Sequence, residues 1–347
     1  MQKKSIRIFL AVICLVLSYA VVALAADNFS AKQIELIKQG DKYLAERNVE
    51  GALKAYDQAL ALGKAGQDII YLKKVVVFGV QGKIKEAQQA CESAIKANPK
   101  NPDGYYNLGE IQAVQKNNAE AEKNFKKALS LAPKDLEINW RLAQFYLDIQ
   151  QNDKAIAQGK AALAIAPNDL NSNWQMTKLY LVVGKSDLAE GQAKKMVSLE
   201  PKNPLSHQAL AQTYLYLKKD DLAFKSAKDI QELNAKDPNY QWMAALIYLQ
   251  GDNLKAAKEA FGEVVKLDDQ AVPAYAYLGQ IAYAEKDYKE AVNQWNNIIK
   301  IAPDNIPALL SISNAYKQMG DKKNCKAYAE KVLKLDPKNE AAKELTK

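Results

Sequence analysis

Residues 102–133 read PDGYYNLGEIQAVQKNNAEAEKNFKKALSLAP, and this stretch decides the fold. It holds two runs of mostly apolar residues at helical spacing, separated by the turn-forming residues 116–118. The first run is Tyr105, Leu108, Gly109 and Gln112, and the second is Ala121, Phe125, Ala128 and Leu131. The stretch is therefore predicted to form one helical hairpin.

The hairpin recurs along the chain at a constant step of 34 residues. Its closing residue, mostly proline, recurs as Pro99, Pro133, Pro167, Pro201, Ala235, Asp269, Pro303 and Pro337. A small residue of the second helix recurs at the same step as Ala87, Ala121, Ala155, Ala189, Ala223, Ala257, Ala291 and Cys325. Closely packed helix axes require a small side chain where they touch, so this place marks the contact within each hairpin.

This pattern resembles the tetratricopeptide repeat, in which an aromatic residue, Leu-Gly, a later Ala-x3-Phe and a closing proline follow one another. The matching residues are Tyr105, Leu108, Gly109, Ala121, Phe125 and Pro133, and Gln112 stands where the family prefers tyrosine. The resemblance implies an all-α fold, a right-handed α-solenoid of nine helical hairpins. It also implies a non-enzymatic binding scaffold that needs no cofactor.

The repeat divides the chain without leaving a second domain. The predicted parts are a signal peptide (1–25), a lead (26–32), the first repeat (33–66), an irregular second repeat (68–101), repeats three to nine (102–339) and the remnant of a cap (340–347). Ser30 and Gln33 form a capping-box signature at the first helix. An extra residue near Gly66 breaks the step once. Residues 71–78, YLKKVVVF, favour a strand on propensity alone, but their place in the array predicts a helix.

The N-terminus has the features of an export signal. Basic residues precede an apolar run over residues 8–17, and the small-residue motif 23–25 predicts cleavage before Ala26. A cleaved chain would be exported to the periplasm or cell envelope. The alternative is an uncleaved anchor, because residues 8–26 are nearly long enough to span a bilayer of about 30 Å. The protein would then contact a membrane only through this segment.

Composition argues against metal and nucleic-acid binding. Part of the net charge of +8 lies in the leader, and only Arg47 and Arg141 remain as arginines beyond it, although arginine is the residue best suited to phosphates and bases. A single histidine, His207, and the distant Cys91 and Cys325 cannot assemble a tetrahedral metal site. All three are expected to be packed side chains, and no catalytic or cofactor-binding residues are predicted.

In the family that this chain resembles, the second, fifth, ninth and twelfth residues of each repeat line a concave groove. The fifth place carries Tyr106, Trp140, Trp174, Gln208 and Trp242, and the ninth carries Glu110, Gln144, Lys178, Gln212, Gln280 and Asn314. Two interpretations of the aromatic residues stand. They form a stripe that binds a partner, chiefly through Trp140 and Trp174, or they pack between neighbouring first helices.

The first two repeats are predicted to form a more apolar part of this groove. Its residues are Ile34, Ile37, Ile69, Leu72, Val76 and Val80. This part is expected to accept an amphipathic helix, either from a partner or from the lead of another copy.

Three hypotheses of function follow. The first is an exported or envelope-associated adaptor that holds a peptide or helical segment of partner proteins in its groove. The second is a structural protein that forms homo-oligomers through repeats one and two. The third is a glycan-binding accessory module of an envelope enzyme complex, because aromatic rings also stack on sugars.

Overall fold

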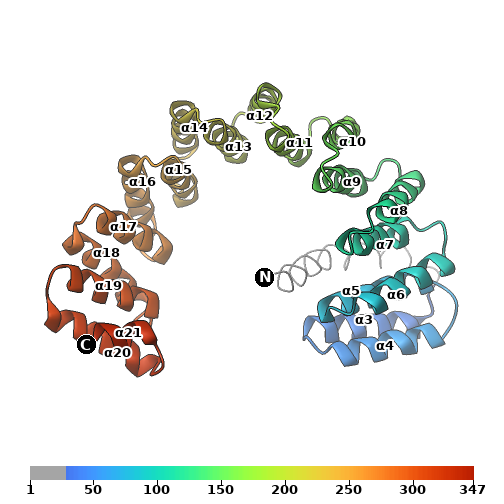
Figure 1. Ribbon diagram of the computed structural model, residues 1–347, viewed down its shortest axis with the longest axis horizontal. Coiled ribbons are helices and arrows are strands. Elements are labelled where there is room, and N and C mark those ends of the chain that lie inside the picture. The colour runs from blue at the N-terminus through green and yellow to red at the C-terminus, as the bar shows by residue number, and fades with distance from the viewer. Residues whose placement is uncertain (1–28) are drawn as a thin grey trace. The chain divides into compact units, whose positions relative to one another are not determined.

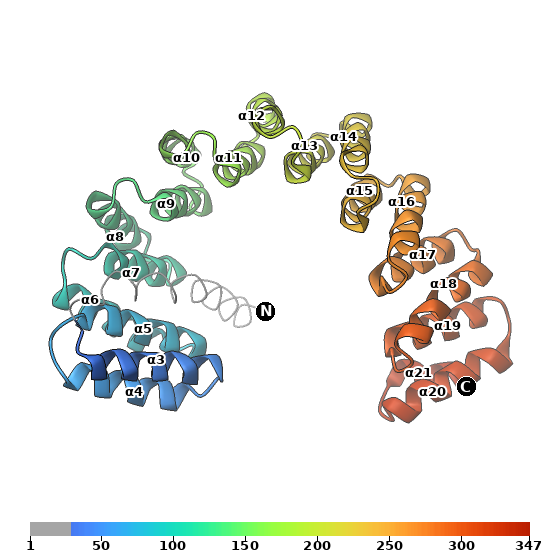
Figure 2. The same ribbon diagram turned by 180° about the vertical axis from the view of Figure 1, so that it is seen from behind.

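The computed structural model describes residues 29–347 (Figures 1 and 2). The predicted signal peptide and the start of the lead lie outside these residues. Residues 29–347 contain helices and no strand, which confirms the all-α prediction. They form two compact units, residues 29–167 and Asn168–Lys347, each built of helical hairpins.

The helices pair in chain order. The first unit contains the hairpins α3 (Ala31–Ala45) with α4 (Val49–Ala61), α5 (Gln67–Gln81) with α6 (Ile84–Ala97), α7 (Pro102–Val114) with α8 (Asn118–Leu131), and α9 (Leu136–Asp148) with α10 (Asn152–Ile165). The second unit contains α11 (Leu170–Val182) with α12 (Ser186–Leu199), α13 (Pro204–Tyr216) with α14 (Asp220–Leu233), α15 (Pro238–Gln250) with α16 (Leu254–Leu267), α17 (Val272–Ala284) with α18 (Tyr288–Ile301), and α19 (Ile306–Gln318) with α20 (Lys322–Leu335). A short helix, α21 (Glu340–Leu345), follows and buries Ala342 and Leu345 against the last hairpin.

Side-chain caps set where the first helices begin. Six of them follow an Asn or Asp that accepts a backbone N–H: Asn101, Asp135, Asp169, Asn203, Asp237 and Asn305. The capping box predicted at the start of the array is present. Ser30 Oγ accepts from Gln33 N at 3.2 Å, and Ser30 N donates to Gln33 Oε1 at 3.1 Å. Because these caps satisfy free N–H groups of a helix start, they favour the same starting place in the repeats that carry them. The helices α5 and α17 begin without a side-chain cap.

Small residues allow the two helices of each hairpin to approach. The recurring alanines from Ala87 to Ala291 are each at most 1% exposed, and Cys325 is buried in the last repeat. At a second contact between the two helices, a small residue faces a larger one. In the eighth repeat Gly279 of the first helix lies against Trp295 of the second, whereas in the second repeat Val75 of the first helix packs in one cluster with Cys91 of the second. The larger side chain at this contact therefore comes from the second helix in one repeat and from the first helix in another.

The strand-like run of residues 71–78 lies within the helix α5. Apolar side chains leave this helix on two sides, because Ile70 and Val77 are buried with the first repeat and Val75 with the second and third. Burial on both sides overrides the strand propensity. The predicted helix is confirmed.

A residue in the left-handed conformation follows the first helix of every hairpin. These residues are Arg47, Gly82, Lys116, Gln150, Gly184, Lys218, Asp252, Lys286 and Gly320. Such a residue commonly ends a helix, and glycine adopts the conformation without strain. Gly66, at φ +59°, takes up the extra residue between the first two repeats, and the Phe29 ring lies where its Cβ would be.

Two open glycines of the fifth repeat test this assignment. A Cβ at Gly184 or at Gly191 would meet no atom within 4 Å, but only Gly184 has a positive φ, of +73°. Gly184→Ala should therefore lower the free energy of unfolding by about 1 kcal/mol. Gly191→Ala, inside α12, should raise it by about 0.5–1 kcal/mol. Urea titrations followed by circular dichroism would measure both, and equal signs would contradict the assignment.

His207, Cys91 and Cys325 are packed side chains. Cys91 and Cys325 are buried and unpaired, and His207 Nε2 lies 2.8 Å from the carbonyl oxygen of Pro201. Over residues 29–347, no group of His, Cys, Asp and Glu is arranged to hold a metal ion. No helix in the same range combines the length and apolar character required to cross a membrane.

Candidate functional site

The first helices of the hairpins form the inner layer of each unit. First helices of consecutive repeats contact one another, as α5 contacts α7, α11 contacts α13, and α13 contacts α15. Consecutive second helices make no comparable contact within the described residues, so they lie farther apart, on the outer side (Figures 1 and 2). The residues predicted to line a groove therefore belong to the layer with the tighter curvature.

Two aromatic residues of the fifth place, Tyr106 and Trp242, are too buried to form a binding stripe. Tyr106 is buried, and its hydroxyl donates to Glu137 Oε1 of the next repeat at 3.3 Å. Burial, with smaller effects of Glu110 and Glu137, raises the pKa of this hydroxyl. Trp242 is half-buried and packs edge-on against Tyr277 of the next repeat, with ring centroids 5.7 Å apart. These two rings serve the packing between first helices.

Trp140 and Trp174, by contrast, are partly exposed to solvent. Both are half-buried, Trp140 in the first unit and Trp174 in the second. The exposed Lys178 places its Nζ 5.7 Å from the centre of the Trp174 ring. Gln144 is exposed and donates to Asp148 Oδ1 at 2.8 Å, and Gln212 is half-buried. The structure thus brings Trp174 and Lys178 together as one cation–ring pair.

The apolar groove predicted for the first two repeats loses two of its residues, because Ile37 on α3 and Ile69 on α5 are both buried. Ile37 is 1% exposed and lies in the core of the first repeat, so its assignment to the groove is wrong. Its helix is amphipathic, and Ile37 lies on the side that faces α4 and α5. Leu72 and Val76 are half-buried and Val80 is exposed, all on α5 at intervals of four residues. These three form a stripe along one side of that helix.

The largest exposed apolar side chains on the inner layer are ones that the sequence did not single out. Val182 and Tyr216, the last residues of α11 and α13, are 61% and 59% exposed, and Leu205, near the start of α13, is 58% exposed. Val182 and Tyr216 occupy the thirteenth place of their repeats. The resemblance implies groove residues at the second, fifth, ninth and twelfth places. These include the place of Leu205, the second of its repeat, but not the thirteenth.

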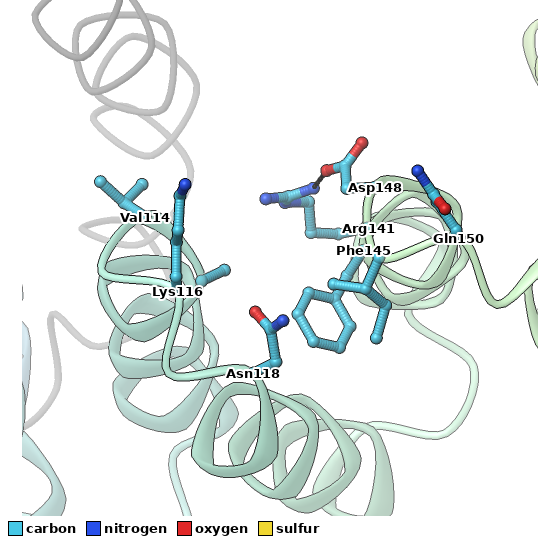
Figure 3. A pocket seen from close by; sticks show the side chains of 9 residues that line it. Val114, Lys116, Asn118, Arg141, Phe145, Asp148 and Gln150 are labelled. Carbon is cyan, nitrogen blue, oxygen red and sulfur yellow. Dashed lines mark ion pairs between the residues drawn. The ribbon is translucent and has the colours of Figure 1, made fainter. Parts of the chain in front are cut away.

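A pocket of about 480 Å³ opens in the first unit beside the turn of the third repeat. Val114 and Lys116 come from the end of α7 and its turn, Asn118 begins α8, and Arg141 and Phe145 come from α9 (Figure 3). Asp148, Ile149 and Gln150 complete its second wall. Lys116 and Gln150 are the left-handed residues of their turns, so the pocket lies between two successive hairpin turns.

A buried ion pair holds the arginine of this pocket. Arg141 Nε donates to Glu110 Oε1, and Arg141 Nη1 lies 3.5 Å from Asp148 Oδ2. The guanidinium also lies over the Phe125 ring, 5.7 Å from its centroid. Burial raises the pKa of Glu110 although Arg141 opposes this effect. Burial lowers the pKa of Arg141, but the charge of Glu110 outweighs it, so the net direction is upward.

The ion pair was not predicted, although both residues were noted. Glu110 belongs to the ninth place of the third repeat and was assigned to the groove, yet it is 2% exposed. The sequence distinguishes Arg141 only as one of two arginines beyond the leader. The two residues are 31 positions apart, and only the stacking of adjacent repeats brings them together.

The hairpin array, with apolar and polar side chains exposed on its first helices, defines a helical-repeat scaffold. Models of the tetratricopeptide repeat match residues 72–135 and 243–306, residues 115–179, and residues 306–339. These matches together cover more than half of the chain. The chain belongs to the tetratricopeptide repeat family, whose fold is generally a non-catalytic scaffold for protein interactions.

Several solved structures are similar in fold. The C-terminal part of a TPR repeat-containing protein from Cytophaga hutchinsonii is 19% identical with a TM-score of 0.48, over 70% of this chain and 99% of that one. Yeast Tom70 is 15% identical with a TM-score of 0.40, over 90% and 87%. A tetratricopeptide repeat protein from Parabacteroides merdae is 17% identical with a TM-score of 0.38, over 81% and 97%. A comparison with curated protein sequences found no match.

Proposed function

We propose that this protein is a non-enzymatic adaptor that holds segments of partner proteins against its first helices, within an exported or envelope-associated complex. The observation that carries the proposal is the exposure of Val182, Leu205 and Tyr216 on neighbouring first helices of one unit. Val182 and Tyr216 end consecutive first helices at the same place of their repeats, and exposed apolar side chains on the inner layer support a site of interaction there. The half-buried Trp174 and the exposed Lys178 lie eight and four residues before Val182 on α11, on the same side of that helix.

Export rests on the leader, which lies outside the described residues. The basic start, the apolar run and the small-residue motif 23–25 support a cleaved signal. Fractionation of cells that express the full chain, followed by N-terminal sequencing, would test this part. A mature chain that begins at Ala26 in the envelope fraction is expected. An intact leader on a soluble cytoplasmic chain would contradict it.

The partner surface is tested by replacing Trp140 and Trp174 together with alanine. We expect the double variant to lose most of the partner protein that crosslinks to the wild-type chain in intact cells, because truncating a tryptophan anchor costs about 2 kcal/mol or more of binding energy. Mass spectrometry of the crosslinked products would measure the loss. Leu267→Ser, an exposed substitution at the end of the outer helix α16, is the matched control. Full partner capture by a folded double variant would show that both rings serve packing alone.

A further inference from the structure

The last outer helix, α20, is strongly basic. It contains five lysines and one glutamate, which give it a net charge of +4. The leader contributes three of the 48 basic residues and none of the 40 acidic ones, so the rest of the chain has a net charge of +5. The excess of positive charge beyond the leader is therefore about as large as the charge of this one helix.

The charged residues lie on one exposed face of α20. Residues four apart on a helix share a side, and two neighbouring stripes of this spacing are exposed along their whole length: 322, 326, 330, 334 and 323, 327, 331, 335. They hold all five lysines, with Glu330, Ala327 and Leu335 at the other places. From Lys322 to Lys334 this basic face extends about 18 Å along the helix axis. The opposite side of the helix, with Ala329 and Val332, is buried in the last hairpin.

Neighbouring carboxylates do not neutralise the basic face. None of its five lysines forms an ion pair within residues 29–347. Lys331 Nζ lies 4.4 Å from the centre of the Tyr328 ring, a contact that leaves its charge in place. Asp321 and Asp336, at the two ends of α20, accept hydrogen bonds from neighbouring asparagines instead.

Helix stability does not explain this arrangement. Lys322 and Lys323 lie in the first turn of α20, where the helix dipole favours acidic residues. The same place of the sixth repeat, in α14, carries Asp220 and Asp221. On α12, α14 and α16 a lysine pairs with a glutamate one turn away, but α20 has no such pair. The two first-turn lysines therefore cost stability, which indicates a role outside the fold.

The type of cation suits a diffuse anionic surface. Lysine carries a compact, strongly hydrated charge that attracts anions without a fixed geometry, whereas arginine fits single carboxylates or phosphates. Clusters of four to eight basic residues on a helix are typical of binding to anionic lipids. Leu335, which is 42% exposed at the end of one stripe, adds an apolar side chain of the kind that enters the boundary between headgroups and acyl chains.

We propose that the basic face of α20 holds the protein against a bilayer that contains anionic lipids. The lysine ammonium groups lie near the lipid phosphates, and Leu335 enters the headgroup boundary. The inner layer stays free for partners, because α19 packs on the buried side of α20. This contact is separate from the leader, the only membrane contact that the sequence predicts. It does not depend on the proposed function, so either proposal can fail alone.

Sedimentation with vesicles tests the proposal. The probe is phosphatidylcholine vesicles with or without phosphatidylglycerol, mixed with the chain that begins at Ala26. This chain contains every described helix but lacks the apolar run of the leader, which would bind vesicles by itself. We expect it to sediment with the anionic vesicles only, and less at high salt, which screens the attraction. Binding to neither kind of vesicle, or equally to both, would overturn the proposal.

Two double variants assign binding to this face. Lys322→Gln with Lys323→Gln should weaken binding to anionic vesicles about twenty-fivefold, since each lysine near the bilayer contributes a factor of about five. Its thermal midpoint should stay the same or rise, because cations leave the first turn. Lys225→Gln with Lys228→Gln removes the same charge from α14, an outer helix with a net charge of −2, and should leave binding unchanged. Equal losses in both variants would mean that net charge, and not this face, attracts the bilayer.

Glu330→Gln should change binding in the opposite direction. It removes the carboxylate of the basic face, so it should tighten binding about fivefold, whereas damage to the helix would weaken it. A labelled polyglutamate peptide, titrated by fluorescence anisotropy, tests the other kind of anionic partner. If the chain does not bind anionic vesicles but binds this peptide through Lys322 and Lys323, the face serves an acidic protein segment and the membrane proposal is overturned.

Discussion

Arg141→Met is expected to lower the free energy of unfolding of the first unit by about 3–5 kcal/mol, because it leaves the buried carboxylate of Glu110 without its charge partner. Glu110 is 2% exposed, and its Oε2 has no hydrogen-bond partner within the described residues. Methionine retains the apolar stem of the arginine but brings no charge. The cost should therefore come from the orphaned carboxylate rather than from a cavity.

The pH dependence of the loss of stability in Arg141→Met would show whether the charge of Glu110 causes it. Burial already raises the pKa of Glu110 in the folded protein, and removing Arg141 should raise it further. A carboxyl group with a raised folded pKa binds more protons in the folded than in the unfolded state, so its contribution to stability falls as the pH rises above the unfolded value of about 4.3. The difference between variant and wild type should thus be small near pH 4 and grow toward pH 7.

Hydrogen exchange would measure the effect locally. Protected amides of α7 and α9 should exchange at least about a hundredfold faster in Arg141→Met at pH 7, since 1.4 kcal/mol corresponds to a factor of ten. Arg47→Met, at an exposed arginine of the first repeat, is the control and should change little. Adding Glu110→Gln to Arg141→Met should recover much of the loss. No recovery would mean that packing, and not charge, dominates at this site.

Much of the fold follows from the period of the sequence. A step of 34 residues predicts the number of hairpins, and the recurring small residue, such as Ala121 or Ala257, predicts where the two helices touch. Both predictions need only the local pattern, because each hairpin repeats the same contact. The strand-like residues 71–78 show how strongly the array constrains local choice, since they form a helix against their own propensity.

The surface was harder to predict, because exposure depends on the neighbouring repeat. The fifth-place rings of Tyr106 and Trp242 meet residues of the next first helix, Glu137 and Tyr277, which cover them. The thirteenth place ends its helix, and in two repeats of the second unit its side chain is more than half exposed. The sequence pattern of a single repeat predicts neither the cover that the next repeat provides nor the exposure of the thirteenth place.

Gly279→Val is the second substitution with a large expected effect, a loss of about 3 kcal/mol in the free energy of unfolding. A Cβ at Gly279 would lie 2.3 Å from Nε1 of the buried Trp295, so any side chain displaces the indole. Overpacking of this kind costs about 1–3 kcal/mol and occasionally more. Helix propensity alone predicts the opposite sign, because valine is a better helix former than glycine. Gly262→Val, where a Cβ would meet nothing within 4 Å, is the control and should be neutral or slightly stabilising.

The second repeat supplies the compensating change. At the equivalent contact it pairs Val75 with Cys91, so a large first-helix residue is matched there by a small one on the second helix. Trp295→Cys alone should cost about 3–5 kcal/mol through the cavity it leaves. Combined with Gly279→Val it should cost up to about 3 kcal/mol less than the two single losses together, because the valine fills part of that cavity. Urea unfolding of the four chains would measure this coupling. Strict additivity would show that the contact tolerates each size independently, and that the pairing of small with large is not what sets the distance between the two helices.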